Sequence, residues 1–417
     1  MRSETNAAAA LTDECWKPQG ERVSRCRWSG ERTDAVTRAD LIRRNRRFSG
    51  ARHKQERHGR HVASDPDRGQ WTLRGLRLAD GPAILKLSQN VFGSSPTLAQ
   101  WHWQFADNPF GAPIVVVAEA DGGVLVGHFA LVPLPYLRDG RRCRAALSVQ
   151  SMVHPAFQRR GMLKLLADVA VKRAEDEGLV ATIAFLNDRS VHAYRKHFGW
   201  SEPSGSNFIH VAALDVGETI RSLVRRRLGR DTPPLRALGV PMIPAPRPRA
   251  RYRIRTVARF DERADALWRS FALDLRFSVD RSATFLNWRT SDVRGSYTRF
   301  VAEEGNALAG IVITRTEEKF GIRFGYVVEL FFETTKADAG TELLTHALEH
   351  LHASGCCMAT AVTSGSGAIA RALRRSRFVR LPRRLMPHGI HFCAKQPGAS
   401  NLPRAAWFLS WLDHDVV

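Results

Sequence analysis

The hydrophobic residues between positions 71 and 214 form strand-like runs first and a helical pattern afterwards. The strand-like runs lie at residues 71–80, 112–134 and 136–153. Asp121-Gly122-Gly123 and Asp139-Gly140 are hairpin-turn signatures inside the second and third runs, and a short helix closed by Gly93 separates the first run from the second. This half of the chain is therefore expected to begin as a set of antiparallel strands.

An amphipathic helix follows the third run. Its apolar residues recur at the spacing of one helical face, at Met162, Leu165, Leu166, Val169 and Ala170. The pattern continues with a strand at 179–186, a helix from Asp188 to His197 and a strand at 207–214. Strands followed by alternating helices and strands predict an α/β (α+β) fold, with a mixed, mostly antiparallel sheet and helices on its faces.

The second half of the chain repeats this pattern weakly. Trp103 precedes Glu119, and Trp288 precedes Glu303, at nearly the same spacing, and a glycine-containing turn follows in both halves. A repeat of this length predicts two tandem copies of one domain, because the repeats of solenoid proteins are shorter.

Changes in composition suggest the domain boundaries. The first part of the chain is polar and rich in Arg and His, which predicts a disordered basic tail. A nucleic-acid-binding arm and a start codon assigned too far upstream are the alternatives for it. A later Pro- and Arg-rich stretch is typical of a linker. The expected division is a tail at 1–69, a first domain at 70–215, a linker at 216–250, a second domain at 251–395 and a C-terminal tail at 396–417.

The formal net charge of +22 suits polyanionic partners such as nucleic acid, anionic lipid or phosphorylated ligands. A basic tail and linker in an Arg-rich chain is the plainer explanation. The six cysteines form no C-x-x-C pair and no zinc-ligand spacing, which favours a reducing cytosol and predicts no metal site. No stretch approaches the about 18 apolar residues that span a bilayer. We therefore expect a soluble, cytoplasmic protein, and its oligomeric state stays open.

The start of the amphipathic helix is a candidate phosphate site. The first N–H groups of a helix have no partners within the helix and carry the positive end of its dipole, so they bind phosphate. Gly161 has no Cβ and lets a ligand approach the backbone closely. Arg159 and Arg160 add positive charge, and Pro155 ends the preceding strand.

Two segments together resemble the GNAT superfamily of N-acyltransferases. The first is the loop Gln158-Arg159-Arg160-Gly161-Met162-Leu163, which is similar to the superfamily's acyl-CoA signature, Gln/Arg-x-x-Gly-x-Gly/Ala, but ends in Leu163. The second is residues 187–200, in which Asn187, Ser190, Tyr194, Gly199 and Trp200 hold the places of the next conserved segment in register. The motifs cover about residues 71–215, and the second half resembles the superfamily only in its order of elements. More narrowly, the chain resembles the Eis-like subgroup of tandem GNAT proteins.

The resemblance implies direct transfer of an acyl group from acetyl-CoA, the acyl-donor substrate, to an amine. It implies that a backbone N–H of Val153 or Met152 binds the thioester oxygen, and that Tyr194 is the general acid that protonates the departing thiolate. A phenol with an ordinary pKa of about 10 is close to a thiolate in basicity, so this proton transfer is feasible. The implied coenzyme contacts are Met152, Val153, Gln158, Arg159, Arg160, Gly161, Met162, Leu163, Asn187 and Ser190.

The general base is left open by the sequence. The candidates are His102, Asp107, Glu119, His154 and the carboxylate of Val417, and His154 is included among the catalytic residues because it lies next to Pro155. The terminal carboxylate is a candidate only through the Eis-like resemblance. Trp101, Trp103 and Phe105 resemble an acceptor-site helix, and core packing is the alternative for them.

The second domain is expected to be degenerate. Its counterpart of the loop, residues 336–344, keeps Gly340 but carries Asp338 and Glu342, which repel anions, and Ala372 stands where Tyr194 stands in the first domain. We therefore expect a structural partner that shapes the acceptor cleft. The predicted activity is acyl-CoA-dependent N-acetyl transfer to a primary amine of a small molecule, sugar or peptide. A non-catalytic GNAT-like scaffold and a tRNA-dependent aminoacyltransferase are the alternatives.

Overall fold

A computed structural model describes residues 36–37, 71–203, 208–215, 217, 219, 251–319, 322–365, 367–382, 390–396 and 406–414. These residues all belong to one unit, Ala35–Val417. The expectations for the basic tail, apart from a two-residue strand, and for the linker fall outside the described residues.

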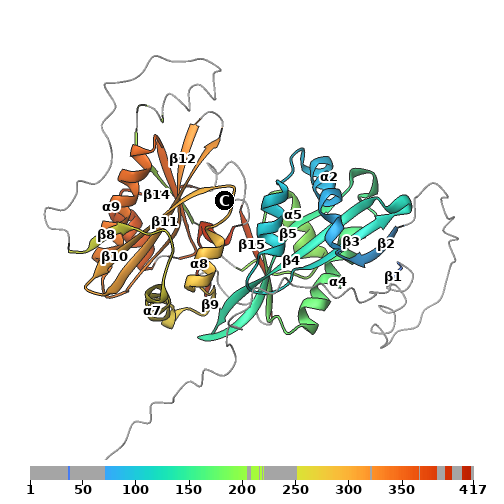
Figure 1. The fold of residues 1–417 in the computed structure, drawn as a ribbon, viewed down its shortest axis with the longest axis horizontal. Helices are drawn as coiled ribbons and strands as arrows, with labels where there is room; N and C mark the ends of the chain where they lie inside the picture. The colour runs from blue at the N-terminus through green and yellow to red at the C-terminus, as the bar shows by residue number, and fades with distance from the viewer. Residues whose placement is uncertain are drawn as a thin grey trace, which may run out of the picture. The chain divides into compact units, whose positions relative to one another are not determined.

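The first sheet is built mainly from the first half of the chain (Figure 1). Its strands, in spatial order, are β1 (Val36–Thr37), β2 (Trp71–Gly75), β3 (Ile114–Ala120), β4 (Leu125–Arg138), β5 (Arg141–Val153), β6 (Ala181–Leu186) and β15 (His391–Lys395). All neighbours are antiparallel except β5 and β6, which run parallel. A short strand, β9 (Phe277–Val279), pairs with the far end of β4. The predicted mixed, mostly antiparallel sheet is confirmed. The first strand is shorter than the expected 71–80, because residues Leu78–Asp80 form a 3-10 turn.

The second sheet repeats the order of the first. Its strands are β14 (Val379–Arg380), β7 (Phe208–Ala213), β13 (Met358–Thr363), β12 (Ile322–Phe332), β11 (Ala307–Lys319), β10 (Ser296–Glu304) and β8 (Arg253–Thr256). Here too a single neighbouring pair, β12 and β13, is parallel. Two sheets of the same strand order confirm the fold class that the sequence predicts.

The two sheets exchange one strand. We expected β7 to complete the first domain, but it pairs with β13 and β14 of the second sheet. In return β15, from the end of the second half, pairs with β6 of the first sheet (Figure 1). The exchange is symmetric, because each strand adds to the same position in the other sheet. The expected boundary near residue 215 therefore does not separate two independent sheets.

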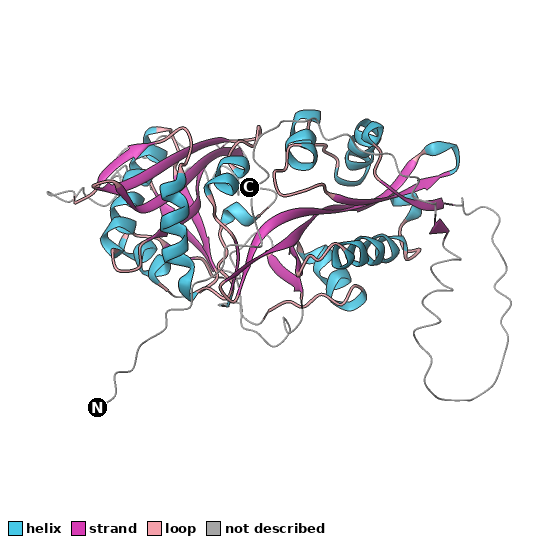
Figure 2. Ribbon diagram, turned by 60° about the horizontal axis from the view of Figure 1, so that its bottom comes forward, coloured by secondary structure: helices cyan, strands magenta, loops and turns pink. Residues whose placement is uncertain are grey.

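Helices cover both faces of the sheets (Figure 2). One face of the first sheet, which we call the α2 face, packs α2 (Gly81–Phe92), α3 (Leu98–Trp101) and a π-helical turn, η2 (His102–Ala106). The opposite α4 face packs α4 (Met162–Asp176) and α5 (Asp188–His197). The second sheet carries α7 (Glu262–Phe271) and α8 (Ala283–Arg289) on one face, and α9 (Ala337–Ala353) and α10 (Ala368–Arg375) on the other.

Helix α4 is nearly the predicted one. Met162, Leu166 and Ala170 are buried on the sheet as expected, together with Ala167, Val171 and Ala174. Leu165 and Val169 were expected on the same face but lie at its margin, half-buried. The apolar stripe is therefore rotated slightly toward the small residues. Met162 and Leu166 pack against Gly127 of β4, where a Cβ would come within 3 Å of both side chains.

One core cluster joins the α2 face of the first sheet to α7 and α8 of the second. At its centre the indole rings of Trp103 and Trp288 stack with centroids 5.3 Å apart. Each indole N–H donates to the other residue's backbone carbonyl, at 3.0 Å from Trp103 and 3.3 Å from Trp288. These two residues were aligned as repeat equivalents in the sequence, and the reciprocal hydrogen bonds relate them by a local two-fold.

Residues 406–414 pack into the same cluster rather than forming a free tail. Arg281, with no exposed side-chain surface, donates to Glu329 at 2.9 Å and to Asp413 at 2.6 Å. Arg289 donates to the carbonyls of Leu412 and His414. Trp407, Leu409 and other apolar residues of the segment are buried.

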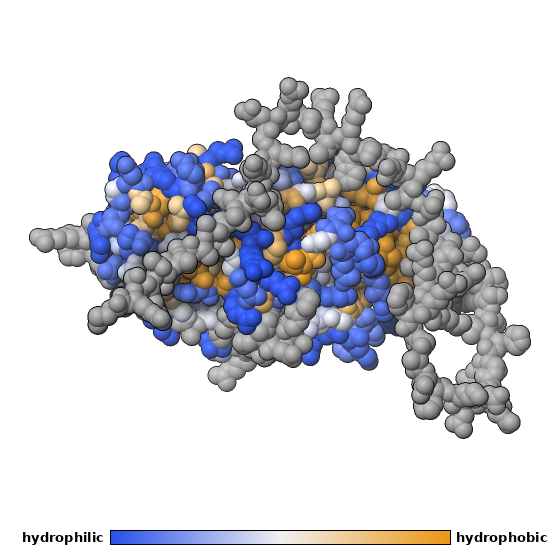
Figure 3. All heavy atoms as spheres, turned by 90° about the horizontal axis from the view of Figure 1, so that it is seen from below, coloured by the Kyte–Doolittle hydropathy of each residue, from blue (hydrophilic) through white to orange (hydrophobic). Residues whose placement is uncertain are grey.

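The surface of the described residues is mainly hydrophilic in the view of Figure 3, with small apolar patches.

Candidate active site

Strands β5 and β6 separate part-way along their length. Their parallel pairing covers only Ala145–Leu147 and Ala181–Ile183. Beyond that point β5 continues to Val153 and β6 to Leu186 without pairing to each other. The separation leaves backbone N–H and C=O groups of β5 without strand partners on this side, and a sheet normally satisfies such groups. Unpaired strand groups of this kind can bind an extended ligand through main-chain hydrogen bonds.

A β-bulge lies in β5 on the unpaired stretch. The register against β4 shifts between His128 and Ala130, so that Gln150 and Ser151 together oppose one residue. Gln150 has φ +50°, which is uncommon for a non-glycine residue and marks local strain. Strained backbone of this kind clusters at functional sites, and the bulge re-aims the side chains around it.

The bulge brings two serines to Tyr194. The phenol oxygen of Tyr194 lies 2.9 Å from Ser148 Oγ and 2.6 Å from Ser151 Oγ. In a regular strand residues three apart point to opposite faces, so the bulge is what places both hydroxyls on the α4 face. Tyr194 is 2% exposed and packs against Phe198 and Trp200. The predicted general acid therefore reaches from α5 to the unpaired part of β5.

Val153 turns its backbone toward the gap between the strands. The N–H of the next residue, His154, donates to Val126 of β4 at 2.8 Å. Antiparallel hydrogen bonds alternate along a strand, so Val153 directs its N–H and C=O away from β4, while Met152 directs its groups toward β4. The Val153 carbonyl accepts the side-chain amide of Gln158 at 3.0 Å. Of the two predicted oxyanion donors, the geometry favours Val153 over Met152.

The loop between β5 and α4 is the predicted phosphate cradle. Arg159 and Gly161 have φ of +63° and +76°, and Gly161 is the N-cap of α4 without a side-chain cap. A Cβ at Gly161 would meet no atom within 4 Å, so the space before the helix is open among the described residues. Arg159 is exposed, and Arg160 lies over the Phe157 ring and donates to Ala156. The arrangement can bind a diphosphate at the helix start.

The remaining predicted coenzyme residues lie in the first turn of α4 and at the start of α5. Met162 is buried against the sheet and Leu163 is half-buried. In the predicted site each would therefore offer the coenzyme its backbone N–H in the first helical turn, and not its side chain. Asn187 is the N-cap of α5, and its side-chain oxygen accepts the N–H groups of Arg189 and Ser190 at 3.0 Å. Asn187 therefore has a structural function at the end of β6, beside the gap.

The structure places the candidate general bases in different environments. His154 Nδ1 accepts the Ala156 N–H at 3.3 Å, which puts the proton of the neutral ring on Nε2. In this tautomer the lone pair of Nδ1 accepts the backbone N–H and Nε2 carries the proton, and the catalytic role of His154 stays a prediction. Glu119 pairs with Arg74 at 2.5 Å in a structural ion pair. His102 and Asp107 are exposed on and after η2, and Val417 lies outside the described residues.

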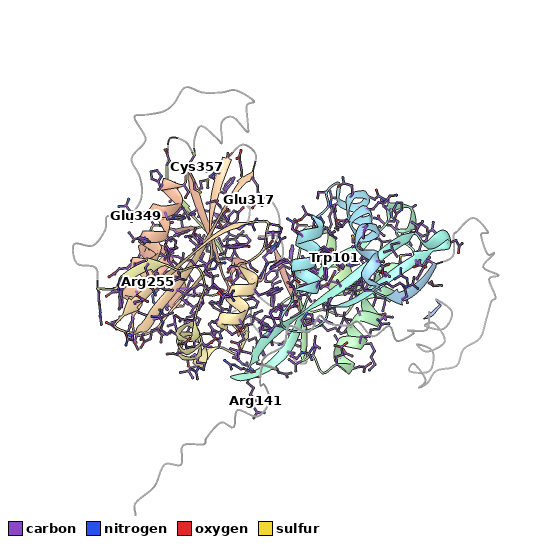
Figure 4. The ribbon with its side chains drawn as sticks, in the orientation of Figure 1. Trp101, Arg141, Arg255, Glu317, Glu349 and Cys357 are labelled. Carbon is purple, nitrogen blue, oxygen red and sulfur yellow. The ribbon has the colours of Figure 1, made fainter. Side chains whose placement is uncertain are left out.

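The aromatic residues that resemble an acceptor-site helix lie on the α2 face. Trp101 (Figure 4), Trp103 and Phe105 are all buried, so core packing accounts for them. Between them, Gln104 is half-buried and accepts the Gln150 side-chain amide at 3.1 Å. Ser148, Gln150, Ser151 and His128 were not predicted as site residues. Polar residues within a buried strand were the available signal, but the bulge that groups them cannot be seen in the pattern.

The corresponding loop of the second half is different. Helix α9 begins at Ala337, and a Cβ at Gly340 would come within 2.3 Å of the Phe332 ring. Gly340 is therefore required for helix–sheet packing and not for a ligand. Glu342 accepts backbone N–H groups at Arg251 and Tyr252, each at 3.4 Å, and Lys336 pairs with Glu304 and Glu333.

Neither a cluster of metal ligands nor a membrane-spanning helix is found among the described residues. No group of three or more His, Cys, Asp or Glu side chains in the described ranges is placed to hold a metal ion. Within the same residues, no helix combines the length and the apolar composition of a membrane span.

The strand gap, the bulge and the open helix start all lie in a stretch of the chain that matches a known domain family. Residues 72–202 match the acetyltransferase (GNAT) domain. This supports the GNAT resemblance, and the Eis-like subgroup stays a prediction. No curated protein matches the chain.

Solved structures of acyltransferases share the fold over most of the chain. A GCN5-related N-acetyltransferase from Anabaena variabilis ATCC 29413 has a TM-score of 0.55 and 11% identity, with 78% of this chain and 72% of that chain covered. A GCN5-related N-acetyltransferase from Kribbella flavida has a TM-score of 0.52 and 14% identity, with 80% of this chain and 72% of that chain covered. Saccharomyces cerevisiae N-myristoyltransferase with bound myristoyl-CoA has a TM-score of 0.52 and 10% identity, with 82% and 86% covered. At these identities the likeness shows the fold alone.

Proposed function

We propose that this protein is an acyl-CoA-dependent N-acyltransferase that uses acetyl-CoA and transfers the acyl group directly to a primary amine of a small molecule, sugar or peptide. One observation supports this above all others. The uncapped start of α4 lies directly after a strand that has left its neighbour and turns the N–H of Val153 into the gap. Phosphate and thioester oxygens are the groups that these two features suit.

The residues divide the work of binding. The backbone N–H groups from Arg159 to Leu163 would bind the diphosphate, with the guanidinium groups of Arg159 and Arg160 adding charge. The N–H of Val153 would hydrogen-bond the thioester oxygen and stabilise the negative charge that develops on it. Such a contact is typically worth about 3 kcal/mol of transition-state stabilisation.

In the reaction the amine nitrogen attacks the thioester carbonyl, a C–N bond forms and the C–S bond breaks. The amine loses a proton and the thiolate gains one. Tyr194 would supply the thiolate proton from its phenol, and Ser148 and Ser151, within 2.9 Å and 2.6 Å of that oxygen, would orient it. The second half of the chain would have no coenzyme site of this kind, because the start of α9 is occupied by packing and by carboxylates.

A thiol-release screen tests the proposal. Wild-type protein is mixed with acetyl-CoA and representatives of each amine class: an aminosugar, an aminoglycoside, a polyamine and a lysine peptide. The proposal expects amine-dependent release of coenzyme A with at least one class, and acylation of the amine by mass spectrometry. A protein that neither binds acetyl-CoA nor releases thiol would instead fit the scaffold alternative. Salt-sensitive retention of RNA without acetyl-CoA binding would fit the aminoacyltransferase.

A further inference from the structure

The bulge in β5 interrupts the hydrogen-bond ladder at Gln150. Gln150 and Ser151 oppose a single residue of β4, and a bulge of this kind disrupts the regular pairing of its residues. A buried carbonyl without a hydrogen bond costs about 1–3 kcal/mol, and the positive φ of Gln150 adds strain. A bulge of this kind persists only where its surroundings hold it.

His128 is the residue that holds it. Its Nδ1 lies 2.7 Å from the Gln150 carbonyl oxygen, and the side chain is fully buried. Burial lowers the pKa of His128 to about 4, so the ring is neutral at neutral pH. A carbonyl only accepts, and therefore Nδ1 carries the hydrogen and donates it.

The other ring nitrogen of His128 has no reactive role. Among the described residues Nε2 has no hydrogen-bond partner, and it has no exposed surface through which an amine could reach it. The edge of the ring lies against Phe105 of η2, with ring centroids 6.4 Å apart. A sealed nitrogen cannot exchange a proton with a substrate, so His128 is not a general base.

The bulge connects His128 to the hydroxyls around Tyr194. Ser151 is the residue directly after Gln150, and its hydroxyl makes the shorter of the two contacts with the Tyr194 phenol. If the bulge relaxed to regular strand, Ser151 would turn to the α2 face and this contact would be lost. The side chain of Gln150 is itself fixed, on the α2 face, by its hydrogen bond to Gln104.

We propose that His128 is a positioning residue that fixes the β5 bulge and thereby holds the Ser151 hydroxyl against Tyr194. This inference rests on the proposed function, because it assigns the bulge to the proton-donor site. His128 acts through the backbone of Gln150 and touches neither substrate. It belongs to β4, outside both segments that resemble the GNAT superfamily in sequence.

Two nearly isosteric variants separate hydrogen bonding from packing. His128→Asn keeps an N–H donor at the position of Nδ1, whereas His128→Leu has a similar shape and no donor. We expect His128→Leu to lower kcat by roughly 10- to 100-fold, the effect of a misplaced catalytic group, and to leave the KM for acetyl-CoA within about twofold. His128→Asn should recover most of the lost kcat.

Hydrogen exchange gives a readout that does not depend on activity. Backbone amides of the peptide spanning residues 148–153 should exchange faster in His128→Leu than in wild type and His128→Asn, with no change in the peptide spanning residues 162–176. The inference would be overturned if His128→Leu and His128→Asn had the same kcat and the same hydrogen exchange in residues 148–153. If the wild-type protein shows no acyl transfer, that result counts against the proposed function alone. The hydrogen exchange of residues 148–153 in the two variants would still decide whether His128 holds the bulge.

Discussion

Gly161 and Gly178 stand at the two ends of α4, and replacing each by Ala separates ligand binding from backbone strain. Their φ angles are +76° and +77°, and a Cβ at either position would meet no atom within 4 Å. The two substitutions therefore impose the same left-handed strain and neither creates a clash. Only Gly161 lies at the helix end that would bind the diphosphate.

The expected magnitudes follow from that geometry. An alanine in the left-handed region costs about 1–2 kcal/mol, so both variants should lose a similar amount of unfolding free energy. A methyl group in the open space before α4 should in addition weaken acetyl-CoA binding by about tenfold, which corresponds to about 1.4 kcal/mol. Calorimetric titration with acetyl-CoA gives the affinity, and urea unfolding gives the stability of each variant.

The comparison between the variants decides the result. We expect the dissociation constant of Gly178→Ala to equal that of wild type and that of Gly161→Ala to rise. Acetyl-CoA at 100 times its dissociation constant should also stabilise the wild type by about 2.7 kcal/mol. If both variants bind acetyl-CoA as tightly as wild type, the diphosphate does not lie at the start of α4 and the reasoning is wrong.

Three further predictions follow from the buried polar groups. Tyr194→Phe should lower kcat by about 100-fold, the usual effect of losing a general acid, while the affinity for the coenzyme stays near that of wild type. An unchanged kcat in steady-state kinetics would refute the assignment of Tyr194 as the general acid. Arg281→Met leaves Glu329 and Asp413 buried without their cation and should lower the free energy of unfolding in urea by about 3–5 kcal/mol. Its control, Arg276→Met, removes an exposed ion pair with Asp139 and should lower it by no more than about 1 kcal/mol. Equal losses in the two variants would show that the buried network does not hold residues 406–414. Because burial lowers the pKa of His128 from 6.5 to about 4, the unfolded chain takes up this proton first as the pH falls, so this contribution to stability is complete above about pH 6.5 and declines toward pH 4. About 2 kcal/mol of it should be lost by pH 5 in wild type and not in His128→Asn, and identical pH dependence in the two proteins would contradict the prediction.

The sequence predicted the elements that local patterns determine. The amphipathic period of α4, the turn residues before it and the helix from Asp188 to His197 are all short-range features, and the structure places them within a few residues of the expected positions. The prediction of a phosphate cradle rests on the same local information, because Gly161 and the helix start are neighbours in the chain. The repeat of Trp103 and Trp288 was also detectable, although nothing in it indicated that the two rings stack.

Features that depend on distant partners were not predictable. Strands β7 and β15 carry the same kind of apolar pattern, so neither sequence indicates which sheet it joins. Ser148 and Ser151 converge only because Gln150 bulges, and the bulge depends on His128 in another strand. The segment 406–414 was grouped with a tail by its position, although its buried Trp407 and Trp411 were a signal for packing.

The central claim is that acetyl-CoA binds between β5 and β6 with its diphosphate at the start of α4. Hydrogen exchange measured by mass spectrometry, with and without saturating acetyl-CoA, tests this most directly because it locates the ligand on the chain. We predict slower exchange in peptides covering residues 151–165 and unchanged exchange in residues 336–344, the counterpart of the loop in the second half. Protection confined to the second half, or no protection anywhere, would contradict the account.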